Sequence, residues 1–116
     1  MTTLRLVLDC TDVAAQARFW ITALGYRQTW ADGQYVNLGP MADSAGPQLL
    51  LQGVPEPKTA KIRLHLDLLV EGVDAEVARL EALGATRLPS EPFDEYGHQW
   101  VVMADPEGNE FCVCAN

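Results

Sequence analysis

The feature that most constrains the fold is an internal repeat, because two segments of the chain resemble each other in order and in residues. LRLVLD (4–9) resembles IRLHLD (62–67), ARFWITALGYR (17–27) resembles ARLEALGATR (78–87), and GPQLLLQ (46–52) resembles GNEFCVC (108–114). Similarity at a fixed spacing indicates a duplicated structural unit. The repeat therefore predicts two related modules, 1–53 and 62–116, with the proline-containing segment 54–61 as an exposed connection between them.

Each module reads as a strand, a helix and three further strands. In the first, an apolar strand over 4–10 precedes Thr11 and Asp12 as helix caps, a helix over 13–25 ends at a glycine, and strands follow at 26–31, 34–38 and 47–53. In the second, the strand is 61–70, the helix 73–84, and the later strands are 86–89, 99–104 and 110–114, with 90–100 as a loop. The fold class is thus α+β: two tandem βαβββ modules whose strands form a curled mixed sheet around a cleft, with the helices outside.

Length and charge limit the function. A chain of 116 residues suits a single domain with one core. The 8 Lys and Arg against 16 Asp and Glu give a net charge of −8, which argues against binding to nucleic acid or to an anionic membrane and favours a cationic or neutral ligand. No long apolar run or signal peptide is evident, so a cytoplasmic location is expected, with the three cysteines as reduced thiols.

Several motifs resemble those of a known superfamily. They are the two LG helix ends, the run HLDLLVEGVDAEVARLEALGA (65–85), VPEPK (54–58), and above all DPEGN (105–109) before the last strand. On these the chain resembles the glyoxalase/bleomycin-resistance/extradiol-dioxygenase (vicinal oxygen chelate) superfamily, in its glyoxalase-like domain subgroup. The resemblance implies the fold and a two-fold homodimer, but that fold hosts lyases, isomerases, dioxygenases and antibiotic-sequestering proteins. The alternative is a ferredoxin-like or other α+β fold with a coincidental repeat.

Alternation along the strands divides their side chains between two faces. The leucines of the first and fifth strands, including Leu4 and Leu64, are expected to pack under the helices together with Leu49, Leu51, Phe111 and Val113. The opposite set is expected to face the cleft: Arg5, Asp9, Leu50, Gln52, Arg63, His65, Asp67, Glu110 and Cys112. Converging charges must be paired or bind a ligand. We favour a ligand site; the alternative is an ion-pair network, Arg5 with Asp67 or Arg63 with Asp9.

In metal-dependent relatives the resemblance implies four ligand positions, one in each of the first, fourth, fifth and eighth strands. Here those positions hold Arg5, Leu50, His65 and Cys112. A guanidinium stays protonated and a leucine has no donor atom, so two of the positions are lost. We therefore expect no catalytic metal and no other cofactor. The alternative is a divalent metal bound through His65 with Asp67, Asp9 or Glu110 as substitute ligands.

The candidates for catalysis are His65, Asp67 and Cys112, and Trp100 is a candidate for ligand binding. His65 has the chemistry of a general base oriented by Asp67 or Glu110, and its other interpretation is a structural histidine. Cys112 beside His65 is either an activated thiolate or, as we favour, a small buried side chain. Trp100 is the best cleft-facing aromatic for stacking on a planar ligand, with Trp30, Tyr35 and Tyr96 as further aromatic candidates.

Three functional hypotheses follow. The first is a metal-independent protein that binds a small organic molecule in the cleft, through Arg5, Asp9, Gln52, Arg63, Trp100 and Glu110. The second is a lyase, isomerase or dioxygenase that uses His65 with Asp67, Glu110 or Cys112. The third is a regulatory domain without catalysis. Metal analysis separates the first from a metal-dependent form of the second.

Overall fold

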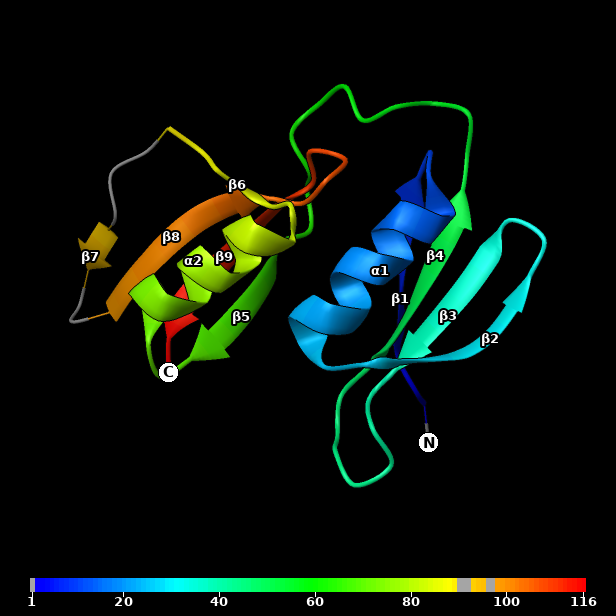
Figure 1. Ribbon diagram of the computed structural model, residues 1–116, viewed down its shortest axis with the longest axis horizontal. Helices are drawn as coiled ribbons and strands as arrows, with labels where there is room; N and C mark the ends of the chain where they lie inside the picture. Colours follow the sequence, from blue (N-terminus) through cyan, green and yellow to red (C-terminus); the bar gives the residue numbers. More distant parts are fainter. Residues whose placement is uncertain (1, 90–92, 96–97) are drawn as a thin grey trace. The chain divides into compact units, whose positions relative to one another are not determined.

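The computed structural model describes residues 2–89, 93–95 and 98–116, with side chains over 2–89 and 100–116. The chain divides into two compact units, Met1–Lys58 and Thr59–Asn116 (Figure 1). This division falls within the predicted connection 54–61. Each unit has its own sheet and its own helix, as the repeat predicts. That the two units form one domain stays a prediction.

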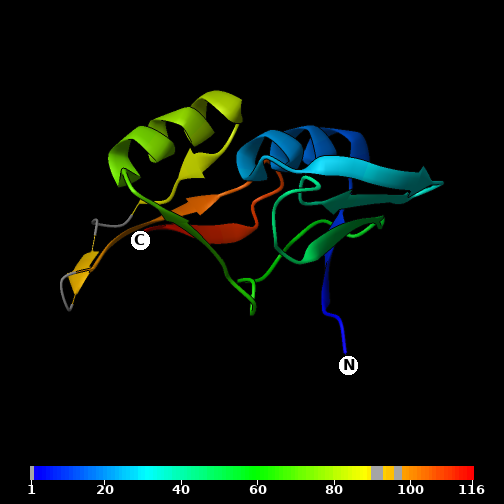
Figure 2. The ribbon, with the colours of Figure 1, turned by 90° about the horizontal axis from the view of Figure 1, so that it is seen from below.

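Unit 1 (Met1–Lys58) contains one helix and a four-stranded mixed sheet. Its elements are β1 Arg5–Cys10, α1 Val13–Leu24, β2 Arg27–Asp32, β3 Tyr35–Gly39 and β4 Gln48–Gly53. The strand order is β1-β4-β3-β2, with β1 and β4 parallel and the other pairs antiparallel. The α1 helix covers one face of this sheet (Figures 1 and 2).

Unit 2 (Thr59–Asn116) repeats this topology. Its elements are β5 Leu66–Val70, α2 Val73–Leu83, β6 Thr86–Arg87, β7 Phe93–Glu95, β8 His98–Ala104 and β9 Glu110–Ala115. The order β5-β9-β8-β6, with β5 and β9 parallel, matches that of unit 1 strand for strand. The α+β class and the tandem βαβββ modules are therefore confirmed. Within the described residues, neither helix is long and apolar enough to cross a membrane.

The helices begin and end where the sequence indicates. Asp12 caps α1 by accepting a hydrogen bond from the backbone N–H of Ala15 at 3.0 Å. Gly25 and Gly84 end the two helices in left-handed conformations, with φ of 67° and 117°, which cost glycine little. The buried side of α1 consists of Gln16, Ala17, Phe19, Trp20 and Ala23.

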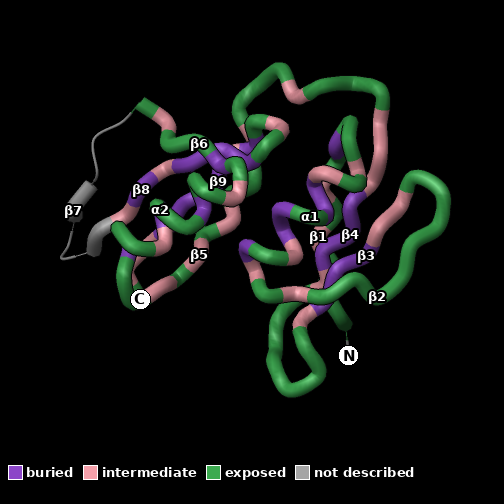
Figure 3. The backbone as a smooth tube through the Cα atoms, in the orientation of Figure 1, coloured by how far each residue is buried: buried purple, intermediate pink, exposed green. Residues whose placement is uncertain are grey.

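The core of each unit lies between its helix and its central strands. Figure 3 shows the buried residues concentrated on β3, β4, β8 and β9, whereas β2 is exposed throughout. Leu49, Leu51, Phe111 and Val113, which were predicted to pack under the helices, are all at most 3% exposed. Leu50 and Cys112, predicted to face the cleft, are also buried, at 6% and 9%. Because Leu49, Leu51, Phe111 and Val113 leave water almost completely, their burial stabilises both units.

The structure corrects the predicted strand over 61–70. The strand begins only at Leu66, and residues 61–65 lie before it. The physical reason is that the backbone N–H of Ile62 donates to the side chain of Glu110 and not to a backbone carbonyl of β9. Leu4 and Leu64, both predicted to pack under a helix, precede their strands and are 68% and 62% exposed.

A second correction concerns 90–100, which was predicted to be a loop. Residues 93–95 form β7, and β8 already begins at His98. The two strands pair antiparallel, with Phe93 opposite Trp100 and Glu95 opposite His98. Tyr96, a predicted aromatic contact, lies outside the described residues.

Candidate functional site

One face of the unit 2 sheet lies away from α2 and carries polar side chains. We call it the open face of unit 2. The register pairs Asp67 with Cys112, and Cys112 in turn with Val102 on β8. Paired residues project to the same side of a sheet. The same face therefore holds the following side chains: Asp67, Leu69, Trp100, Val102, Glu110, Cys112 and Cys114.

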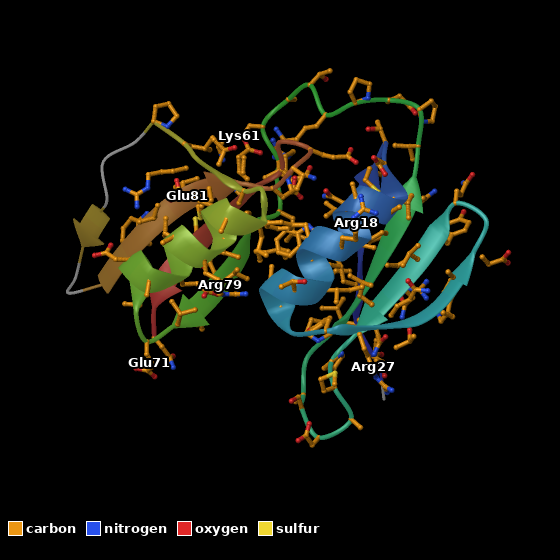
Figure 4. The ribbon with its side chains drawn as sticks, viewed as in Figure 1. Arg18, Arg27, Lys61, Glu71, Arg79 and Glu81 are labelled. Carbon is orange, nitrogen blue, oxygen red and sulfur yellow. The ribbon has the colours of Figure 1, made fainter. Side chains whose placement is uncertain are left out.

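The segment before β5 forms a pocket beside this face, which we call the 61–65 pocket. Its volume is about 530 Å³, and Lys61, Ile62, Arg63 and His65 line it. The segment is held by the Ile62 N–H, which donates to Glu110 Oε1 at 3.1 Å. Lys61, labelled in Figure 4, projects from this segment. Sequence reasoning named Arg63, His65 and Glu110 but missed Lys61, for which the only signal was its position four residues before His65.

His65 is exposed, and its ring bonds to a cation. The Lys61 Nζ lies 3.0 Å from His65 Nε2. An ammonium group only donates, so Nε2 is the acceptor and the other ring nitrogen carries the proton. A carboxylate, Asp67 or Glu110, was predicted to bind the His65 ring. Among the described side chains, the observed hydrogen-bond partner of the ring is Lys61. The lone pair of Nε2 is therefore engaged and is not directed at the pocket as a free base.

Cys112 lies deeper on the open face, at 9% exposure. Burial, followed by the negative charge of Asp67, raises the pKa of the Cys112 thiol to about 11, although the Lys61 charge acts in the opposite direction. Burial and Asp67 also raise the pKa of Cys114. Cys112 is thus a neutral thiol at physiological pH, because burial and then the neighbouring carboxylate raise its pKa to about 11. This environment disfavours the activated thiolate and favours a small buried side chain.

The corresponding face of unit 1 carries a different set of polar groups. Arg5 and Asp9 are exposed on β1, and the register places them beside Gln48 and Gln52 of β4. A hydrogen-bonded chain crosses this sheet, in which Asn37 Nδ2 donates to Gln48 Oε1 at 2.7 Å and to Thr29 Oγ1 at 2.8 Å. Asn37 is only 4% exposed, and its Oδ1 has no hydrogen-bond partner. Sequence reasoning missed it.

The predicted site residues therefore divide between the units. Unit 1 holds Arg5, Asp9 and Gln52, and unit 2 holds Arg63, His65, Asp67, Trp100, Glu110 and Cys112. Within unit 2, Asp67, Trp100, Glu110 and Cys112 share the open face, and Arg63 and His65 line the adjoining pocket. Convergence of the two groups on one cleft stays a prediction, as do the ion pairs Arg5 with Asp67 and Arg63 with Asp9.

The side chains at the four family ligand positions fit a metal ion poorly. Arg5 and Leu50 have no suitable donor, and Leu50 is packed at 6% exposure. In unit 2, His65 Nε2 is engaged by Lys61, and the Cys112 thiol binds a metal only after losing a proton that burial and Asp67 help to retain. Over the described part of the chain, no three His, Cys, Asp or Glu residues are grouped as a metal site would require.

Comparison with known proteins agrees with the topology. The profile of the family described as "Glyoxalase-like domain" matches residues 5–114, while no curated protein matches the sequence significantly. Among solved structures, a fosfomycin resistance protein, FosX, from Listeria monocytogenes is similar, with a TM-score of 0.80 and 14% identity, over 100% of this chain and 93% of that one.

Two further structures show the same fold. A glyoxalase/bleomycin resistance protein/dioxygenase family enzyme from Burkholderia phytofirmans has a TM-score of 0.78 and 20% identity, over 96% of this chain and 95% of that one. A hypothetical protein from S. aureus has a TM-score of 0.74 and 17% identity, over 100% and 98%. At these identities the structural likeness establishes the fold, and the sequence profile establishes the family. The chain therefore belongs to the glyoxalase-like domain family.

Proposed function

We propose that this protein binds a small organic molecule in the 61–65 pocket and over the adjoining open face of unit 2, without a catalytic metal. The observation that carries the proposal is the pocket itself. Its volume of about 530 Å³ lies within the range of about 300 to 1,000 Å³ common for small-molecule sites. Its lining combines one apolar side chain, Ile62, with groups that donate hydrogen bonds.

The open face supplies the apolar contacts that such a ligand needs. Trp100 and Val102 are both half-buried on β8, and they flank Cys112 and Cys114 through the strand register. An indole ring offers a large flat surface for stacking on a planar ligand. Glu110 on this face accepts from the backbone N–H of Ile62 at 3.1 Å, which supports continuity between the pocket and this face.

Independence from metal is supported by donor chemistry. Only His65 and Cys112 of the four family ligand positions have donor atoms, and two ligands bind zinc or nickel weakly. The Listeria neighbour is named a fosfomycin resistance protein, so antibiotics belong among the ligands to be screened. We also propose that the protein acts in the cytoplasm as a homodimer.

A lyase, isomerase or dioxygenase is the second candidate, and the position of His65 on the pocket favours it. In that case His65 would accept a proton from the substrate, and Lys61 would first have to release Nε2. Because this extra step is required, binding without chemistry is the simpler proposal.

A thermal-shift screen of organic ligands, including antibiotics, against the purified full chain tests the proposal. A ligand at about 100 times its Kd adds roughly 2.7 kcal/mol to the folded state, which is several degrees in Tm for a domain of this size. His65→Ala should weaken a hit severalfold, whereas Leu64→Ala is the matched control, since Leu64 is exposed next to it but does not line the pocket.

Metal analysis of the same preparation completes the test. We expect no stoichiometric ion. A metal bound in a 1:1 ratio and lost in His65→Ala would overturn the metal-independent proposal and favour the enzyme. A ligand whose affinity is unchanged in His65→Ala and in Trp100→Ala would place its site elsewhere.

A further inference from the structure

We infer that the ligand of the 61–65 pocket is a small oxyanion, a molecule with a carboxylate or phosphate group. The inference rests on the proposed function, since it names the ligand class of the same pocket. It also runs against the net charge of the chain, which by itself favours a cationic or neutral ligand. The local charge decides, because attraction at hydrogen-bonding distance outweighs the field of distant and screened charges.

The pocket concentrates positive charge on an acidic protein. The chain has 8 Lys and Arg residues against 16 Asp and Glu residues. Two of those eight, Lys61 and Arg63, line the pocket together with His65, one of the two histidines. Among the residues whose side chains the structure describes, no carboxylate lines it.

Arg63 is the group best suited to hold an anion. It is exposed, and among the side chains that the structure describes it forms neither an ion pair nor a hydrogen bond. Arg79, by contrast, is bound to Glu76 at 2.7 Å within one turn of α2. A guanidinium presents a planar set of donors that matches two oxygens of a carboxylate or phosphate. Arg63 therefore retains its full donor capacity for a ligand.

Lys61 and His65 complete the set of donors. The Lys61 ammonium has three hydrogens, and only one is needed for the 3.0 Å contact with His65 Nε2. The same contact leaves the proton of His65 on its other ring nitrogen, which is then a donor. The pocket thus offers donors from three side chains within five residues.

Two nearby carboxylates are engaged elsewhere. Glu110 accepts from the backbone of Ile62 at 3.1 Å, which fixes the segment that carries the donors. Asp67 pairs in register with Cys112 and acts on that thiol. Glu110 therefore holds the segment that carries the donors, whereas Asp67 acts on the Cys112 thiol.

The test is an NMR titration of the full chain with inorganic phosphate, with acetate, and with a panel of neutral and cationic organic molecules. Phosphate or acetate should shift the backbone amides of Ile62, Arg63 and His65. Arg63→Met should weaken that binding about tenfold, since a hydrogen bond to a charged group is lost. Arg87→Met is the control, because Arg87 is an exposed arginine of the same unit outside the pocket.

Each result separates the possibilities. Loss in Arg63→Met but not in Arg87→Met, together with weakening by salt, supports the inference, and the stronger of phosphate and acetate identifies the ligand class. Equal binding by both variants overturns it. Neutral or cationic molecules that shift the same amides, while neither anion does, overturn the oxyanion but leave the proposed function intact. If nothing shifts these amides, both proposals are wrong.

Discussion

The two units share a topology but differ in how they use the sheet face that lies away from the helix. Gly46 and Gly108 occupy matching places in the repeat, so the residues two and four positions later correspond: Gln48 with Glu110, and Leu50 with Cys112. By register, Asn37 faces Leu50 in unit 1 and Val102 faces Cys112 in unit 2. The two faces thus match position by position and differ in chemistry.

This difference changes what the acceptor on the last strand binds. In unit 1, Gln48 Oε1 accepts from Asn37 Nδ2 at 2.7 Å, so the acceptor is bound within the face, although Asn37 Oδ1 has no partner. In unit 2, Val102 has no donor to offer, and Glu110 accepts instead from the backbone of Ile62. The difference between Asn37 and Val102, together with those between Gln48 and Glu110 and between Leu50 and Cys112, distinguishes the two faces. Unit 1 has an internal hydrogen-bonded network, whereas in unit 2 the acceptor holds the segment that lines a pocket.

The largest expected effects are losses of stability on the helix-facing side of each sheet, where the two units are alike. Leu51 and Val113 are counterparts on the helix side, both 0% exposed. Truncation leaves a cavity, so Leu51→Ala should lower the free energy of unfolding by about 2 to 5 kcal/mol, and Val113→Ala by roughly 1 to 3 kcal/mol. Urea denaturation followed by circular dichroism measures both.

The controls for these variants lie on the other side of the same sheets. Val7 and Leu69 are 51% and 62% exposed, so Val7→Ala and Leu69→Ala should change stability by less than about 0.5 kcal/mol. If either variant lowered the free energy of unfolding as much as Leu51→Ala does, these faces would have to be covered in solution. The two sides of the sheets would then not differ in burial.

The sequence was sufficient for the features that depend on local pattern. Repetition predicted both modules, and the local patterns of helix caps and strand alternation predicted the helix ends and the burial of Leu49, Leu51, Phe111 and Val113, but not the exposure of Leu4 and Leu64. Long-range contacts decided the rest. The predicted strand over 61–70 begins only at Leu66, and this late start depends on the contact of Ile62 with Glu110, 48 residues away. The buried Asn37 depends on the register between β3 and β4, which alternation within one strand does not fix.

A smaller loss of stability is expected when Asn37 of unit 1 is replaced by valine, the residue at the matching position 102 in unit 2. Asn37→Val removes the donors to Gln48 and Thr29, but it also removes a buried oxygen that lacks a partner. Because the second change offsets part of the first, stability should fall by about 1 kcal/mol. Thr29→Val removes only the exposed acceptor of Asn37, at the end of this series of hydrogen bonds, and should lower the free energy of unfolding by less. An increase in the unfolding free energy of Asn37→Val would show that the polar chain does not stabilise unit 1.

The smallest effect concerns the thiol that replaces a leucine at the matching position in unit 2. With a pKa of about 11, Cys112 is ionised to only about one part in a thousand at pH 8, so alkylation by iodoacetamide should be slow and should rise with pH towards 11. Asp67→Asn removes a negative neighbour, which lowers the pKa and increases the thiolate fraction. Since burial is the larger cause and persists, the rate at pH 8 should rise severalfold and by less than tenfold.

Mass spectrometry of the alkylated peptides resolves Cys112 from Cys114, and Glu81→Gln on α2 is the control for loss of one negative charge in the same unit (Figure 4). That control should leave the rate at Cys112 unchanged, because Glu81 is not among the groups that act on the thiol. Rapid alkylation of the unmodified protein at neutral pH would indicate a thiolate. The open face of unit 2 would then hold a nucleophile, and the argument for a binding site without chemistry would fail at this residue.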